Sequence, residues 1–201
     1  MMSALHNVIL SYDTFEYDRQ LVNEARELGQ PIVLKGILQR AETLNQNGRI
    51  YPLPILQREV RNYQKLINER RAMGELDHPE SSVIELKNVS HIVTSMYFKG
   101  NDVYGSIELL DTPAGKIAQS LVANNVTFGI SSRGVGSTKK MGDTYTVQED
   151  FVLVCLDLVS EPSTPGAFML KEGKLSNDQL KQYFTSGDRI DRIVNDIIAW
   201  T

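Results

Sequence analysis

The sequence predicts an α+β fold, in which a core of six to eight β-strands is flanked by helices and followed by a helical tail. Short apolar segments separated by glycine-containing turns fill most of residues 89–159, a pattern typical of strands. Amphipathic patterns with a helical period lie on both sides of that region, at residues 54–67 and 190–197. With 201 residues the chain can form one domain with a sizeable core, predicted as residues 1–173, followed by a tail of residues 174–201.

The first part of the chain is expected to contain one clear strand and one clear helix. A short strand near residues 8–10 and a helix over residues 19–28 fit the composition, whereas residues 31–39 form the clearer strand. Residues 45–49 are polar and have turn chemistry. Pro54 suits the first turn of a helix, and the apolar residues after it are spaced four, three and four apart. This apolar stripe consists of Leu56, Val60, Tyr63 and Ile67.

Most of the predicted strands lie after residue 88. They are expected at residues 89–98, 103–110, 126–132, 143–148 and 151–159. Residues 99–102 form a hairpin loop, and residues 112–123 form a short helix. In the tail, Ser176 and Gln179 form a capping box at the start of one helix, and a second amphipathic helix follows Asp188.

The overall composition argues against several classes of function. A net charge of −4 with scattered basic residues argues against a nucleic-acid-binding protein. A single cysteine, Cys155, excludes an internal disulfide and a cysteine-based zinc site. The chain shows no signal peptide at its start and no apolar stretch of the roughly 20 residues that a membrane span requires. We therefore expect a protein of the reducing cytoplasm, with no cofactor, metal, membrane or direct nucleic-acid partner.

His78 is the best candidate for a general base among the three histidines. It lies in the turn at residues 74–79, where Pro79 restricts it to an extended backbone and stiffens the turn. A neutral imidazole held at a fixed angle can accept a proton from a hydroxyl group near pH 7. His6 lies in an unconstrained terminal segment, and His91 lies inside a predicted strand, where a structural role is more common. A metal site built from His78 and His91 would lack a third well-placed ligand.

Ser131 is the best candidate for a nucleophile that such a base could activate. Alternation along the strand places Ser132 on the same face as Phe128 and Ile130, which is apolar and directed toward the core. Ser131 lies on the other face with Gly129, where small residues leave room for a substrate backbone. Ser132 is expected to form a hydrogen bond inside the core and so to support the site.

Asp157 is the candidate for the residue that orients the imidazole. It interrupts an apolar strand, where a carboxylate is costly to bury unless it is paired. Orienting an imidazolium would satisfy it. An aspartate that points to solvent at the sheet edge is an almost equally good interpretation. Asp77 is the next candidate, and Glu75 is a weaker one.

The serine pair also has a purely structural interpretation. A Ser-Ser-Arg-Gly sequence is common at strand ends and turns. The Gly-x-Ser-x-Gly pattern is absent, because the flanking glycines are Gly129 and Gly134, and this argues against an α/β-hydrolase. The order histidine, serine, aspartate also differs from the orders of chymotrypsin, subtilisin and the α/β-hydrolases, but it matches the herpesvirus assemblin arrangement.

Four sequence blocks resemble the prohead core proteases of T-even-like bacteriophages. They are residues 36–38 with 45–52, residues 74–79, residues 99–105 and residues 129–137. In this order and spacing the blocks are specific, and they extend over most of residues 36–168.

The resemblance implies a herpesvirus-assemblin-like fold, a mostly antiparallel β-barrel surrounded by helices. It implies a serine endopeptidase inside the immature prohead, in the host cytoplasm, that cleaves scaffold or core proteins and the major capsid protein. His78 and Ser131 match the catalytic pair of the family, and Asp157 follows from its strand position. A homo-oligomer is expected, and an oxyanion hole is expected in the glycine-containing residues 129–136. The alternatives are a non-catalytic structural protein of the capsid core and an esterase or amidase unrelated to viruses.

The resemblance also implies cleavage after glutamate, with an aliphatic residue two positions earlier and a small residue next. Residues 170–173, Leu-Lys-Glu-Gly, fit this pattern just past the predicted core. Residues 22–25 fit it less well, because they fall in the predicted first helix. The sequence therefore predicts self-cleavage between Glu172 and Gly173, although so short a pattern also occurs by chance.

Overall fold

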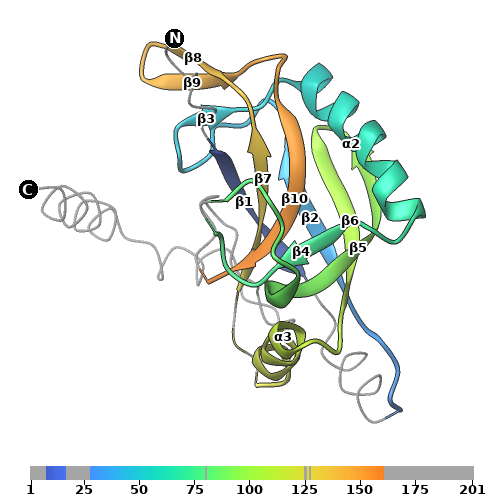
Figure 1. Ribbon diagram of the computed structural model, residues 1–201. Coiled ribbons are helices and arrows are strands. Elements are labelled where there is room, and N and C mark those ends of the chain that lie inside the picture. The colour runs from blue at the N-terminus through green and yellow to red at the C-terminus, as the bar shows by residue number, and fades with distance from the viewer. Residues whose placement is uncertain (1–7, 17–27, 80, 125, 127, 161–201) are drawn as a thin grey trace, which may run out of the picture. The chain divides into compact units, whose positions relative to one another are not determined.

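The computed structural model describes residues 8–16, 28–79, 81–124, 126 and 128–160 (Figure 1). A seven-stranded sheet has the order β10-β7-β1-β2-β6-β5-β4, and a small sheet has the order β3-β9-β8. All pairs are antiparallel except β3 with β9. The strands are β1 (Val8–Glu16), β2 (Ile32–Arg40), β3 (Arg49–Ile50), β4 (Met73–Glu75), β5 (Val89–Lys99), β6 (Asp102–Leu109), β7 (Gly129–Val135), β8 (Thr138–Met141), β9 (Thr144–Val147) and β10 (Val152–Val159).

The large sheet curls until its two edge strands, β4 and β10, approach each other. They are joined by one isolated parallel bridge between Leu76 and Leu158, and the backbone N–H of Asp77 donates to the Leu158 carbonyl over 2.8 Å. No continuous ladder joins these edges in the described chain, so the expected closed barrel is replaced by an incompletely closed sheet. The α+β, strand-rich character is confirmed.

Within the described ranges, two helices pack against this sheet (Figure 1). Helix α2 (Leu53–Asn68) contacts β5 and β10, and α3 (Pro113–Ala123) contacts β5 and β6. In α2 the expected apolar stripe faces the core through Leu56, Val60 and Tyr63. At the start of α3, the Thr112 hydroxyl accepts a hydrogen bond from the backbone of Gly115 at 3.0 Å, a typical N-cap contact.

Helix α2 is attached to the strand that carries Asp157. Glu59 is buried in α2 and accepts a hydrogen bond from the backbone N–H of Leu153 in β10 at 2.8 Å. Arg58 donates to the backbone carbonyls of Glu149 and Phe151. These contacts satisfy polar groups that would be costly to bury unpaired, and they set the position of β10 against the core.

The strand predictions differ from the structure where pairing depends on distant residues. The strand predicted at 126–132 begins at Gly129, and the one predicted at 143–148 is the second half of the β8–β9 hairpin. Strands β3, β4 and β8 were not predicted, because two to four residues give little periodicity and their partners stabilise them. A short 3₁₀ helix, Leu86–Asn88, precedes β5.

Contacts divide the chain into two units, Met1–Leu170 and Lys171–Thr201. The second unit lies outside the described residues, as do His6 and residues 19–27 of the predicted first helix. The boundary at 173 and the helical tail therefore stay predictions. No helix in the described ranges is both long and apolar enough to cross a membrane.

Candidate active site

The three predicted site residues come together where β7, β10 and the segment after β4 meet. Ser131 in β7 lies directly opposite Asp157 in β10 in the antiparallel ladder. Directly opposed residues have their side chains on the same face of a sheet. The bridge between Leu76 and Leu158 brings the chain after β4 to this face, and His78 follows two residues later.

His78 connects the other two residues through its two ring nitrogens. Its Nδ1 lies 2.8 Å from Asp157 Oδ2, and its Nε2 is hydrogen-bonded to Ser131 Oγ. Because an ionised carboxylate can only accept, Nδ1–H donates to Asp157, and Nε2 is left to accept the proton of the serine hydroxyl. The expected juxtaposition of the three side chains is thus confirmed, and the solvent-pointing alternative for Asp157 is wrong, since Asp157 is fully buried.

The turn before His78 has an unusual backbone. Asp77 has a φ of 64°, a left-handed conformation that aspartate tolerates better than most residues. Its N–H is held by the Leu158 carbonyl. Asp77 therefore contributes the backbone turn that precedes His78. The carboxylate beside the imidazole is that of Asp157.

Asp157 is surrounded by hydrogen-bond donors. Its Oδ1 accepts from the backbone N–H of Glu75 at 2.9 Å, from Arg133 Nη2 at 3.2 Å and from Cys155 Sγ at 3.3 Å. Burial raises the pKa of Asp157, but the hydrogen bonds from His78 and Glu75 and the charge of Arg133 outweigh it and hold that pKa below its ordinary value. The carboxylate is therefore ionised at neutral pH and can accept the hydrogen bond from His78 Nδ1–H.

Sequence reasoning missed Arg133 and did not predict the contact that Glu75 makes with it. The Arg133 guanidinium is fully buried, 2.9 Å from Asp157 Oδ2 through Nε, and is paired with Glu75. Strand alternation contained a usable signal, because Arg133 lies two positions beyond Ser131 and so on the same face. Glu75 does not replace Asp157 but lies behind it. The face of Ser131 is therefore not occupied by small residues alone, and Ser131 itself is buried.

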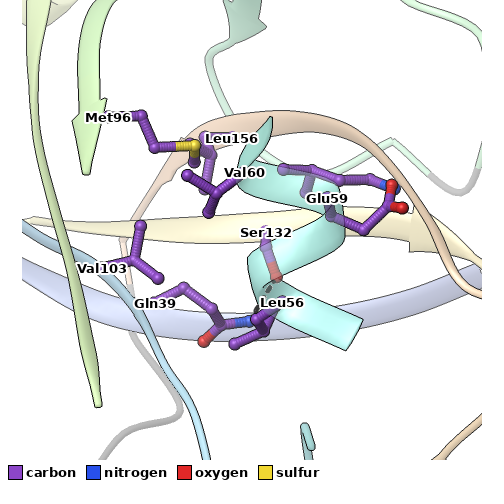
Figure 2. A pocket seen from close by; sticks show the side chains of 9 residues that line it. Gln39, Leu56, Glu59, Val60, Met96, Val103, Ser132 and Leu156 are labelled. Carbon is purple, nitrogen blue, oxygen red and sulfur yellow. Dashed lines mark hydrogen bonds between the residues drawn. The ribbon is translucent and has the colours of Figure 1, made fainter. Parts of the chain in front are cut away.

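Ser132 lies on the opposite face, as alternation predicts. Its Oγ accepts a hydrogen bond from Gln39 Nε2 at 2.8 Å. Figure 2 shows both side chains beneath α2, at a small internal cavity. The cavity is lined by Gln39, Leu56, Glu59, Val60, Met96, Val103, Ser132, Leu153 and Leu156. Ser132 therefore belongs to the core beneath the site.

The glycine-containing segment after Ser131 is partly explained by packing. A Cβ atom on Gly134 would lie 2.3 Å from the Phe151 ring, so only glycine fits there. Phe151 is fully buried. Gly134 thus allows close packing against the loop before β10. This packing explains the glycine structurally, without the expected oxyanion hole.

His91 has the structural role expected for a strand histidine. It is fully buried, its Nε2–H donates to the Leu156 carbonyl at 3.0 Å, and its Nδ1 accepts from the Ser90 hydroxyl at 2.9 Å. Burial lowers the pKa of His91 to about 4. A Cβ on Gly74 would lie 2.3 Å from the His91 ring, so the ring packs directly on β4. Across the described ranges, no cluster of histidine, cysteine or acidic residues could hold a metal ion.

We expect His91 to make the protein less stable in mild acid. Its pKa falls from 6.5 in the unfolded chain to about 4 in the folded protein, so the unfolded chain binds more protons between these values. The free energy of unfolding should therefore fall by about 3 kcal/mol as the pH drops from 7 to 4. Chemical denaturation at several pH values measures this loss. A His91→Gln variant should be less stable at pH 7 but lose less on acidification, and an equal loss in both proteins would contradict the assignment. Asp157, whose pKa is depressed, destabilises the protein only at still lower pH.

Comparison with known proteins identifies the family of this chain. A family model described as prohead core protein serine protease matches residues 18–178. The prohead core protein protease of Enterobacteria phage T4 is 34% identical over 177 residues, which are 83% of this chain and 81% of that protein. The solved structure of the bacteriophage T4 capsid assembly protease matches with a TM-score of 0.66 at 26% identity, and covers 79% of this chain and 99% of that chain. The family model spans most of the chain, and the chain therefore belongs to the prohead core protein serine proteases, as a protease of capsid maturation.

Proposed function

We propose that Ser131, His78 and Asp157 form the catalytic triad of this protease. The observation that carries the proposal is the imidazole of His78, which is hydrogen-bonded to Ser131 through Nε2 and to Asp157 through Nδ1. In this mechanism Nε2 takes the hydroxyl proton as Ser131 Oγ attacks the substrate carbonyl carbon. The same proton is then given to the leaving amine, and water hydrolyses the acyl-enzyme by the reverse sequence. Asp157 keeps Nδ1 protonated and stabilises the imidazolium.

We also propose that the substrates are the scaffold or core proteins and the major capsid protein of the immature prohead. The family description and the names of the phage T4 matches support a setting inside the prohead, and a location in the host cytoplasm is part of the same proposal. An assemblin-like arrangement of the incompletely closed sheet and a homo-oligomeric state belong to the same proposal. The curled antiparallel sheet, whose edges meet at Leu76 and Leu158, supports the first of these.

Active-site labelling tests the triad directly. A fluorophosphonate reacts with an activated serine, and peptide mass spectrometry should locate the adduct on Ser131. The label should be absent from Ser131→Ala and strongly reduced in His78→Ala, because the hydroxyl is then not activated. A non-catalytic structural protein of the capsid core would show no labelling, and digestion of a scaffold protein separates a protease from an esterase. Labelling of Ser132 would contradict the assignment.

Self-cleavage between Glu172 and Gly173 is a further part of the proposal. Both residues lie outside the described part of the chain, and the sequence pattern of residues 170–173 supports the site. Wild-type protein incubated under active conditions should yield a fragment ending at Glu172 and release residues 174–201. Intact-mass measurement should find no such fragment with Ser131→Ala, and Glu172→Gln should block the cut without affecting scaffold digestion. An intact C-terminus while a scaffold substrate is digested would refute self-cleavage here.

A further inference from the structure

We propose that Glu75 and Arg133 are positioning residues for proteolysis, acting together through Asp157. With Asp157 they form a buried group of two carboxylates and one guanidinium, called here the Glu75–Arg133–Asp157 cluster. The proposal rests on the catalytic roles assigned above to Ser131, His78 and Asp157. It adds that the net charge of this cluster, and not Asp157 alone, favours the imidazolium form of His78 during the reaction.

The contacts make the cluster one unit drawn from three strands. Arg133 of β7 contacts both oxygens of Asp157 of β10: its Nη2 donates to Oδ1 at 3.2 Å, and its Nε lies 2.9 Å from Oδ2 in an ion pair. Its Nη2 is also paired with the Glu75 carboxylate at the end of β4. Glu75 contributes a second time, because its backbone N–H donates to Asp157 Oδ1 at 2.9 Å. The side chains of all three residues are fully buried.

The remaining polar atoms of the cluster are also occupied. Arg133 Nη1 donates to the Ser81 carbonyl at 2.6 Å, and Nε lies 3.2 Å from Cys155 Sγ. The Glu75 Oε1 atom accepts from the backbone N–H of Glu85 at 2.9 Å. Such complete pairing is what makes buried charges tolerable, and it holds the Asp157 carboxylate at a fixed angle to His78.

The cluster and His78 together change from a net negative charge to neutral when His78 is protonated. With a neutral imidazole, two carboxylates and one guanidinium carry a net charge of −1. When Nε2 accepts the serine proton, the group including His78 becomes neutral. In a buried site of low dielectric constant, this balance stabilises the protonated state. If Glu75 were uncharged, Arg133 would neutralise Asp157 and the imidazolium would meet no net negative charge.

The other titratable groups near Asp157 do not change the net charge of the site near neutral pH. Cys155 is adjacent on β10, and burial raises the pKa of its thiol, so it stays protonated. Tyr63 faces the site from α2, and burial likewise raises the pKa of its phenol. His91 on β5 has a pKa of about 4 and is neutral. The reacting imidazole of His78 is therefore the group whose charge changes.

Charge-changing variants of the two residues should shift the pH profile of kcat/KM in opposite directions. Glu75→Gln keeps size and hydrogen-bonding capacity but removes one negative charge. It should lower kcat about tenfold or more with little change in KM, and move the acid limb about one pH unit lower. Arg133→Met leaves two carboxylates beside His78 and should move the acid limb higher. A merely structural role would lower stability without such opposite shifts.

The double variant Glu75→Gln/Arg133→Met provides the decisive test. It removes the ion pair as a unit and leaves Asp157 with the original net charge of −1, so its acid limb should return close to that of the wild type. Replacing a buried pair together is usually tolerated better than removing one member, so this variant remains informative if a single variant does not fold. Glu59→Gln, which alters another buried glutamate on α2, is the matched control and should leave the acid limb unmoved.

Two results would overturn the inference. One is a folded Glu75→Gln enzyme with wild-type kcat and an unmoved acid limb. The other is a double variant whose acid limb is displaced from that of the wild type by about one unit in either direction. Fluorophosphonate labelling of the wild type separates these from a failure of the triad, because an unlabelled Ser131 would refute the proposed function before the cluster is tested.

Discussion

Replacing Ser131 with alanine is expected to reduce turnover of a scaffold substrate about 10⁴-fold or more, the scale seen when a hydroxyl nucleophile is removed from a triad. The loss should be in kcat, because the hydroxyl makes its decisive interaction only as the new bond forms. The side chain is small and its Oγ contacts His78, so the fold should survive. Steady-state kinetics together with thermal unfolding measure both effects.

Ser132→Ala is the matched control for this prediction. It removes the acceptor of the 2.8 Å hydrogen bond from Gln39 in the core, which should cost about 1 kcal/mol of stability and little activity. An inactive Ser132→Ala enzyme beside an active Ser131→Ala enzyme would show that the two faces of β7 had been assigned the wrong way round.

His78→Ala is expected to be about as damaging as the loss of Ser131, because His78 Nε2 is the atom placed to accept the hydroxyl proton. The imidazole contacts both Ser131 and Asp157, so the three side chains act as a unit. The double variant Ser131→Ala/His78→Ala should therefore be scarcely less active than either single variant. Comparing the three rate constants with that of the wild type measures this non-additivity, and multiplicative losses would contradict a shared step.

Two aspartate variants complete the test of the unit. Asp157→Asn should lower activity but leave more of it than His78→Ala, because the nucleophile and base remain while control of the imidazole tautomer is lost. Asp77→Asn should stay close to wild type, since asparagine also tolerates the left-handed backbone found at φ 64°. The opposite ranking of the two variants would make Asp77 the third member.

Local patterns were sufficient for several features of this molecule. The apolar spacing after Pro54 predicted α2, and its stripe is buried as expected. Strand alternation separated Ser131 from Ser132, and both side chains lie on the predicted faces. These features depend on periods of 3.6 and 2.0 residues, which neighbouring residues alone determine.

Other features could not be predicted locally, because their partners are far away in the sequence. β4 is a three-residue strand that exists through its pairing with β5. The edges of the sheet are joined by a single bridge between Leu76 and Leu158. How far these edges close depends on the curl of all seven strands. A barrel and an open curled sheet have the same alternation along each strand, so the pattern does not distinguish them.

Local sequence patterns were thus enough to predict the strand-rich α+β character, the face of Ser131 and the candidates His78 and Asp157. The inward orientation of Asp157 toward His78, and the burial of Arg133 and Glu75 behind it, follow from contacts between distant strands. The physical reason is that a buried charge is tolerated only beside its counter-charge. Here the two carboxylates come from β4 and β10 and the guanidinium from β7, so their balance exists only after distant strands have paired.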